Sequence, residues 1–244
     1  LDEISARLSA NFPDEMKVVD VYVPETKFKN IAFIDYDMAI TSPYIREDTA
    51  KNLNELFSGD VFVTIDSDSV VKEDTLRNLV SPFSVNEKCG AVAGNVRVLN
   101  KENGIIPKML NVSFVFSFEF VRSAQSALGA VFCTPGALAA YRKDSVLNCL
   151  EEWLKQSFMG QASTIGEDRA ITNMILKQGL SVYFQKNALV YTNIPEHYGN
   201  LHKMLTRWER SNVRESLMMS KFAYTNFREG AKNGVRFILL AESV

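Results

Sequence analysis

The sequence is poor in the residues that build disulfide scaffolds and zinc sites. Its 244 residues include three cysteines, with no Cys-x-x-Cys pair, and only two histidines, His197 and His202. An odd number of unpaired cysteines argues against a disulfide framework or a zinc ribbon and favours a reducing compartment. We therefore expect free thiols and no structural zinc.

Long apolar runs are also missing. No stretch approaches the roughly 18 consecutive apolar residues that a membrane span needs, and no signal peptide opens the chain. Residues 235–241 turn apolar near the end of the sequence. They predict either an ordinary terminal helix packed on the core or the first turns of an element that continues beyond this chain.

Strong net charge and several familiar catalytic motifs are absent as well. The formal charge of -2 gives no electrostatic support for nucleic-acid binding. The sequence contains no Gly-x-Gly-x-x-Gly, no phosphate-binding loop, no Gly-x-Ser-x-Gly elbow and no His-Glu-x-x-His. The sequence therefore lacks the motifs of dinucleotide oxidoreductases, P-loop NTPases, α/β-hydrolases and zincins.

What the sequence does contain is an alternation of strand and helix patterns. Hydrophobic residues make up 46% and charged residues 23%, which is ordinary for a soluble globular protein. The alternation predicts an α/β fold with a mostly parallel sheet, and we treat residues 1–244 as a single domain. Expected strands cover 17–23, 30–34, 61–65, 91–98, 181–184 and 189–192, with strand and turn over 131–141; expected helices cover 3–11, 46–57, 73–82, 109–130, 168–178 (closed by Gly179) and 201–222.

Residues 61–68 are the most informative segment, an apolar strand sequence that ends in Asp66 and Asp68. Its composition predicts a strand buried on both faces of the sheet, and ligands bind beyond the carboxyl ends of such strands. A side-chain period of two lets both carboxylates point to one side. A divalent cation carrying phosphate oxygens would offset their burial. The ordinary alternative is a following helix that uses Asp68 or Ser69 as its N-cap.

A second acidic segment, Gly166-Glu167-Asp168, opens the helix expected at 168–178. Acidic residues are favoured in the first turn of a helix, so one interpretation is that both carboxylates simply complement the helix dipole. The functional alternative is that one of them faces the crevice as a general base. A carboxylate at a helix start can reach a substrate hydroxyl at hydrogen-bond distance.

A third segment carries arginines at 207, 210 and 214, three and four residues apart on one helix face. The ordinary interpretation is a solvated basic stripe paired with Glu209 and Glu215. The functional alternative is that one guanidinium binds a diphosphate bidentately while the Trp208 indole packs against a sugar ring.

Taken in order, Asp66-Ser67-Asp68, Gly166-Glu167-Asp168 and Arg207-Trp208 resemble the motifs of family 2 glycosyltransferases, nucleotide-sugar enzymes with a GT-A fold. More narrowly, the chain looks like the catalytic domain of processive polysaccharide synthases such as hyaluronan synthases and rhizobial chitin-oligosaccharide synthases. The resemblance extends from about Gly59 to Ser216. Its further support comes from residues 93–97, 122–126, 158–161, 168–173 and 207–215.

The resemblance implies a role for each matching residue. It places Asp66 and Asp20 near the nucleoside and makes Asp68 the ligand of Mg²⁺ or Mn²⁺ on the diphosphate. It makes Asp168 the general base, with Glu167 shaping the site beside it. On the remaining side, it makes Arg207 the group that neutralises the departing UDP and Trp208 the platform under the acceptor sugar, with Cys133, Pro135 and Gly136 lining the acceptor end.

The implied function is inverting, metal-dependent transfer from a UDP-sugar to the hydroxyl of a growing hyaluronan-like or chitin-like polymer. The resemblance divides the chain into a nucleotide-sugar half (about 1–100), an acceptor half (about 101–220) and the start of a membrane-proximal segment (221–244). It also implies a place at the cytoplasmic face of the plasma membrane, held by segments outside this chain, and no nucleic-acid partner.

Departures from the family pattern keep two alternatives open. Met204 stands where the family's Gln-x-x-Arg-Trp motif has glutamine, Thr134-Pro135-Gly136 replaces the acceptor-region Gly-Gly-Pro, and the family's first strand is expected to precede residue 1. One alternative is a non-processive transferase that adds one sugar to a lipid or small acceptor. The other is a catalytically silent GT-A module that only binds.

Overall fold

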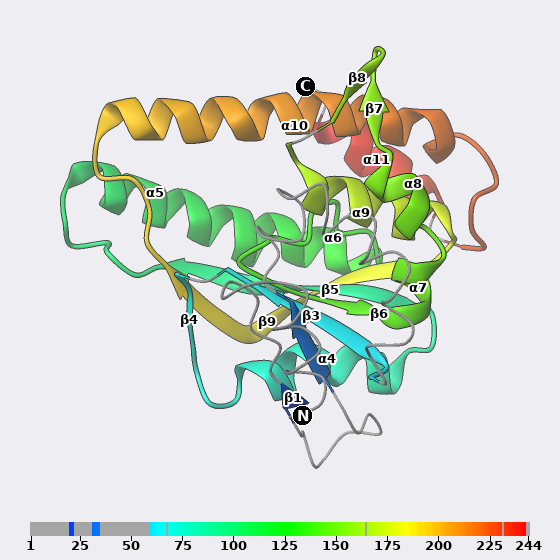
Figure 1. The fold of residues 1–244 in the computed structure, drawn as a ribbon, viewed down its shortest axis with the longest axis horizontal. Helices are drawn as coiled ribbons and strands as arrows, with labels where there is room; N and C mark the ends of the chain where they lie inside the picture. The colour runs from blue at the N-terminus through cyan, green and yellow to red at the C-terminus, as the bar shows by residue number, and fades with distance from the viewer. Residues whose placement is uncertain are drawn as a thin grey trace, which may run out of the picture.

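A computed structural model describes residues 20–21, 31–34, 59–66, 68–163, 165–230 and 232–242, the first two of these segments by their backbone. The helices expected at 3–11 and 46–57, and most of the strand expected at 17–23, lie outside the described residues. The remaining elements form layers of helices around one large sheet (Figure 1).

A seven-stranded sheet forms the centre of the described part of the chain. The pairs β2–β3 and β5–β9 are parallel and the other four pairs are antiparallel, so β2, β3, β5 and β9 all run in one direction. The sheet is therefore mixed and not mostly parallel as expected, but the carboxyl ends of these four strands lie at the same edge. In spatial order the strands are β1 (Asp20–Val21), β2 (Ile31–Ile34), β3 (Val61–Ile65), β6 (Leu138–Arg142), β5 (Cys89–Val98), β9 (Ser181–Thr192) and β4 (Val70–Val71).

Helices cover both faces of this sheet. Helix α4 (Thr75–Val85) lies on one face, and the longer helices lie on the other (Figure 1). On that side lie α5 (Ile105–Val115), the π-helix η1 (Phe116–Arg122), α6 (Ser123–Ala127), α9 (Glu167–Lys177), α10 (Tyr198–Ala223) and α11 (Lys232–Glu242). Helix α10 packs on α9 and lies farther from the sheet than α5 and α9 (Figure 1). Short helices α7 (Lys143–Leu147) and α8 (Leu150–Leu154) lead to a hairpin of β7 (Ser157–Phe158) and β8 (Gln161–Ala162).

The central strands are buried on both faces, as their sequences predict. All of β3 except its last residue, Ile65, is buried, and in β5 only Arg97 is partly exposed. Strands with helices on both sides need apolar side chains at successive positions, which explains the lack of alternation in both sequences.

The aromatic segment expected as a helix over 109–130 is helical throughout α5, η1 and α6. Phe114 and Phe118 are buried four residues apart, whereas Phe116 and Phe120 are 60% and 67% exposed and stack at 5.4 Å. The spacing of two in the sequence thus becomes two helical rows of spacing four, one facing the core and one facing outward.

The two late strands expected at 181–184 and 189–192 are wrong as separate elements, because β9 runs unbroken from Ser181 to Thr192. Its register against β5 jumps between Phe184 and Leu189, which pair with Ala93 and Asn95. The polar residues between them bulge outward instead of ending the strand. Asn95 Nδ2 holds this bulge by donating to the Lys186 carbonyl at 2.9 Å.

The other helix predictions are confirmed within one turn or so. Gly179 follows α9 with a φ of +86°, a left-handed conformation that ends the helix as expected. In the described residues, no helix combines the length and apolar character that crossing a membrane requires.

Candidate active site

The site forms where β3 ends, at the edge that collects the carboxyl ends of the parallel strands. The chain leaves β3 through a turn in which Ser69 N–H donates to the Asp66 carbonyl at 3.0 Å, and it then pairs as β4 with the far strand β9. Asp66 is half-buried and Asp68 is exposed. Thr192, the last residue of β9, donates its hydroxyl hydrogen to Asp68 Oδ1 at 3.5 Å. The two carboxylates therefore sit beyond the strand ends, as predicted.

On the other side of the site, a turn before β6 meets the start of α9. β6 begins beside the end of β3, since Leu138 pairs with Ile65. In the preceding turn, Pro135 is buried and Gly136 is half-buried, and the Pro135 carbonyl accepts the Leu138 N–H at 3.1 Å. The turn thus lies between the Asp66 end of β3 and α9.

The carboxylate of Asp168 is fixed by two donors. Its Oδ1 accepts the Arg169 backbone N–H at 2.7 Å, and its Oδ2 accepts the Cys133 S–H at 3.4 Å. Burial of the Cys133 thiol, reinforced by the charge of Asp168, raises its pKa to about 12, so the thiol keeps its proton and remains a donor. Arg122 holds the Cys133 carbonyl from η1 at 3.4 Å. Asp168 is therefore an ionisable acceptor with a defined orientation.

Glu167 has a structural contact that the sequence did not predict. Its backbone carbonyl accepts the Trp153 indole N–H at 3.0 Å, and its side chain is half-buried. Trp153 comes from α8, so a residue 14 positions away helps to fix the entry into α9. The sequence signal for such a bond is the tryptophan itself, because its indole N–H usually finds a hydrogen-bond partner when the side chain is buried.

Helix α10 closes the site, and Gly166 makes its close approach possible. Gly166 is the residue before α9 and has a φ of +74°; a Cβ there would overlap Ser211 Oγ on α10. Arg214 Nη2 donates to the carbonyls of Ile165 and Gly166 and Nη1 donates to Ser163 Oγ, while Nε pairs with Glu215 at 2.7 Å. The start of α9 is thus pinned to α10.

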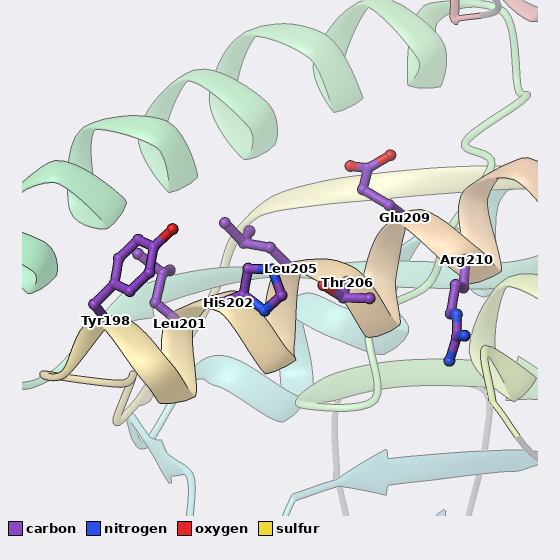
Figure 2. Close-up of a pocket in the computed structure, with 7 residues that line it drawn as sticks. All are labelled: Tyr198, Leu201, His202, Leu205, Thr206, Glu209 and Arg210. Atoms are coloured by element: carbon purple, nitrogen blue, oxygen red, sulfur yellow. The ribbon is translucent and has the colours of Figure 1, made fainter.

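Two further contacts complete this buried polar interface between the helices. Arg169 Nη1 donates to Asn212 Oδ1 at 2.7 Å, and Asn173 Nδ2 donates to Glu215 Oε2 at 2.9 Å. The ordinary interpretation of a solvated arginine stripe is therefore wrong for Arg214, because it and Glu215 are largely buried. Glu209 and Arg210 point to opposite sides of α10 (Figure 2).

Arg207 and Trp208 lie one turn before the contact of Ser211 with Gly166. Arg207 is exposed, and Trp208 is 37% exposed with its ring centroid 6.1 Å from that of Phe114 in α5. A position four residues before Ser211 is on the same helix face, so Arg207 points toward the side where α9 begins. Trp208, next to Arg207 in the sequence, is thus partly covered by Phe114 and partly exposed.

A hollow of about 330 Å³ follows the neighbouring stretch of α10 (Figure 2). None of the predicted site residues lines it, although it flanks Arg207 and Trp208 in the sequence. Its lining residues are Tyr198, Leu201, His202, Leu205, Thr206, Glu209 and Arg210.

The family described as "Glycosyltransferase like family 2" matches residues 27–211, which is most of the chain and extends from before β3 through α9 into the first half of α10. The chain belongs to this family. This membership confirms the resemblance drawn from the Asp-Ser-Asp, Gly-Glu-Asp and Arg-Trp segments.

Curated relatives of this glycosyltransferase domain include hyaluronan synthase 1 of Xenopus tropicalis, 33% identical over 159 residues. Others are an N-acetylglucosaminyltransferase of Rhizobium sp. strain N33, 30% identical over 161 residues, and the hyaluronan synthase of Streptococcus pyogenes, 30% identical over 172 residues. The matches cover 65%, 66% and 70% of this chain, but only 27%, 36% and 41% of the three relatives. The chain therefore spans less than half the length of these relatives.

A solved structure with the same fold is the mannosyltransferase PcManGT of Pyrobaculum calidifontis, described in complex with GDP-mannose and Mn²⁺. The TM-score is 0.54 at 19% identity, and the match covers 80% of this chain and 47% of that one. This likeness confirms the expected GT-A fold of the glycosyltransferase domain.

Of the predicted site residues, the structure brings Asp168 and Cys133 into contact and places Pro135 and Gly136 in the turn beside them. The side chain of Asp20, in β1, lies outside the described residues. Among the described residues, no three histidine, cysteine or acidic side chains cluster as a ready metal cage. The individual roles of the site residues in this glycosyltransferase domain stay predictions.

Proposed function

We propose that this domain transfers a sugar, with inversion, from a UDP-sugar to the hydroxyl of a growing hyaluronan-like or chitin-like polysaccharide. The observation that carries the proposal is the orientation of Asp168. Its carboxylate is held at the start of α9 by the Cys133 S–H and the Arg169 backbone N–H, beside the turn that leads into β6, whose first residue pairs with the end of β3. Such a carboxylate can accept a proton from an acceptor hydroxyl at hydrogen-bond distance.

The proposed reaction is a single displacement. The acceptor oxygen forms a bond to the anomeric carbon, the bond from that carbon to the β-phosphate oxygen breaks, and the hydroxyl proton passes to Asp168. The electron pair leaves with UDP, whose charge Arg207 would neutralise from α10. Trp208 would carry the acceptor sugar on its exposed indole face. Attack from the side opposite the leaving group inverts the anomeric centre, and no covalent enzyme intermediate is needed.

The residues at the end of β3 fit a divalent cation that a nucleotide brings with it. Asp68 is exposed, and its one contact named above, with the Thr192 hydroxyl at 3.5 Å, leaves lone pairs unused. Oxygen-only donors suit Mg²⁺ or Mn²⁺, which take one or two carboxylates and complete their shell with phosphate oxygens and water. Asp68 would hold the cation, with Asp66 nearer the nucleoside. When bound, the cation would stabilise negative charge on the diphosphate.

The partners and place of the domain belong to the same proposal. The donor is a UDP-sugar and the acceptor an oligosaccharide or polysaccharide. We place the domain at the cytoplasmic face of the plasma membrane, attached through segments outside this chain. The three free cysteines, Cys89, Cys133 and Cys149, support a reducing compartment.

The test is calorimetric titration of UDP with Mn²⁺, followed by product analysis with radiolabelled UDP-N-acetylglucosamine, UDP-glucuronate and UDP-glucose in the full-length protein. We expect UDP binding that weakens in Asp68→Ala, and long products from one donor or a pair of donors. If UDP gives no binding heat, and Asp68→Ala behaves like the unmodified protein, the result would favour the catalytically silent GT-A module. Single-sugar products would instead support transfer to a lipid or small acceptor.

A further inference from the structure

Three buried hydroxyl groups lie directly behind Asp168 and link three elements. They belong to Tyr141 of β6, Thr134 of the preceding turn and Thr172 of α9, and their relative exposures are 2%, 0% and 0%. Thr134 Oγ1 lies 2.9 Å from Tyr141 Oη and 2.7 Å from Thr172 Oγ1. Thr172 Oγ1 also accepts the Thr134 backbone N–H at 3.1 Å and donates to the Asp168 carbonyl at 2.6 Å.

Counting hydrogens fixes the direction of this chain. A hydroxyl has one hydrogen to donate and two lone pairs that accept. Thr172 gives its hydrogen to the Asp168 carbonyl, so it must accept from both the N–H and the hydroxyl of Thr134. Thr134 then has no hydrogen left, and Tyr141 donates to it. Burial raises the pKa of Tyr141 above its usual range, so the phenol stays a donor at any working pH.

This series of hydrogen bonds ends at the backbone carbonyl of Asp168, the residue whose carboxylate is the proposed base. Thr134 is next to Cys133, whose thiol donates to Asp168 Oδ2. The turn that contains Cys133 and Thr134 is therefore hydrogen-bonded to α9 at two places. Cys133 bonds to the Asp168 carboxylate, and Thr134 bonds to Thr172, one helical turn later. All three hydroxyls are buried, so removing one of them leaves its neighbour without a hydrogen-bond partner. The surrounding backbone is then expected to shift, because an unpaired buried polar group is unfavourable.

We propose that Thr134 and Thr172 are positioning residues of the transfer reaction, which fix the carboxylate of Asp168 relative to the end of β3. This inference rests on the proposed function, in which Asp168 is the base. Positioning matters because proximity contributes many orders of magnitude to a displacement, and a misplacement of about 1 Å costs on the order of 100-fold in rate.

The experiment compares Thr172→Val with Thr172→Ser in the full-length protein. Valine has the shape of threonine without the hydroxyl, whereas serine restores it. We expect Thr172→Val to lower kcat for transfer by about tenfold or more per UDP-binding site, with the Kd for UDP and Mn²⁺ unchanged within about twofold. Thr172→Ser is expected to recover most of the rate. Dividing the transfer rate by the number of UDP-binding sites corrects for any protein that fails to fold.

A buried threonine on the opposite face of the sheet provides the matched control. Thr75 of α4 is 0% exposed, and its hydroxyl also accepts one backbone N–H, from Lys72 at 3.0 Å, and donates to one carbonyl, that of Leu189 at 2.7 Å. Thr75→Val should lower the unfolding temperature by a similar amount without changing kcat per UDP-binding site. A role limited to stability would make the two valine variants behave alike.

Tyr141→Phe gives a graded second readout, because it removes only the first donor and keeps both Thr134–Thr172 bonds. We expect a loss in kcat of at most about threefold, smaller than that of Thr172→Val. The inference is overturned if Thr172→Val keeps its rate per site, or if serine fails to rescue it. If the unmodified protein neither binds UDP nor turns over any of the three UDP-sugars, the proposed function itself has failed and the positioning role with it.

Discussion

The two sides of the candidate active site are built in opposite ways. At the end of β3, Asp68 is exposed and receives one long hydrogen bond, from Thr192. At the start of α9, Asp168 is half-buried and has three partly buried contacts: its carboxylate accepts from Arg169 N–H and Cys133, and its carbonyl accepts from Thr172. One side offers a carboxylate to solvent, and the other holds a carboxylate in place.

This difference matches what each side would do in the proposed reaction. A group that transfers a proton gains from an orientation fixed before the substrate arrives, since no reorganisation is then needed during the reaction. A side that receives a diphosphate with its cation obtains order from the ligand, because phosphate oxygens complete the cation's shell. We therefore expect changes on the α9 side to alter kcat and fold stability, and changes on the β3 side to alter ligand binding alone.

The largest expected effect is that of Asp168→Asn. Asparagine keeps an oxygen acceptor for the Arg169 N–H but cannot take the acceptor proton, so we expect transfer to fall about 100- to 10,000-fold. The Kd for UDP should stay within about twofold, because the change lies on the α9 side. Radiolabelled product formation and calorimetry on the same preparation measure both quantities. A weakened UDP affinity of tenfold would show that the two sides are not independent.

Asp68→Ala should give the reverse pattern. We expect affinity for UDP in the presence of Mn²⁺ to fall about 10- to 100-fold, since one of few carboxylate ligands is lost. The unfolding free energy should change by less than about 0.5 kcal/mol, because the side chain is exposed and its one named contact is long. Titrations with and without Mn²⁺ separate the cation's share. Equal UDP affinity in the two proteins would remove Asp68 from the metal site.

Gly166→Ala tests how tightly the α9 side is packed. The new methyl group would occupy a left-handed position and overlap Ser211, so we expect a loss of about 2–4 kcal/mol in unfolding free energy. Gly160, in the β7–β8 turn, has a similar φ of +81° with nothing within 4 Å of the added methyl. Gly160→Ala should therefore cost about 1–2 kcal/mol, from the backbone alone. Denaturant unfolding of both variants measures the packing part as their difference.

The sequence was a good guide to elements whose signals are local. The buried run of β3, the amphipathic α9 with Gly179 at its end and the long α10 all carry their pattern within a dozen or so residues. It was a poor guide where partners lie far apart in the chain. The placement of β6 between β3 and β5, and the continuation of β9 through its polar bulge, depend on long-range pairing.

The candidate site divides in the same way. Asp66, Asp68 and Asp168 were predicted as site residues because their order and spacing matched a family; taken singly, such carboxylates also have ordinary uses as helix caps and in first turns. The contacts that orient Asp168 were not foreseen, since Thr134 and Thr172 are 38 residues apart and threonine is common in any core. The pair of Arg214 with Glu215 is present, as the ordinary interpretation of the arginine stripe expected, but it is buried and not solvated. Spacing shows which residues share a helix face but not what covers that face.

The smallest expected effect concerns the thiol that touches Asp168. Burial raises the pKa of Cys133 from 9.0 to about 12, and those of Cys89 and Cys149 by a similar amount. Above about pH 9 the unfolded chain releases these protons while the folded protein keeps them, so stability should fall as pH rises from 9 toward 12 and should be insensitive to these groups below that range.

Cys133→Ser isolates one thiol while keeping a hydrogen-bond donor next to Asp168. The decline in the unfolding midpoint between pH 8.5 and 10.5 should become shallower, and the transfer rate at pH 7.5 should stay within about threefold. No comparable thiol contact is described at Asp68, so UDP affinity should not follow the same pH dependence. A decline of unchanged steepness would mean that the Cys133 thiol ionises as readily in the folded protein as in water. In that case the α9 side of the site would be as open to solvent as the β3 side, and the contrast between them would not hold.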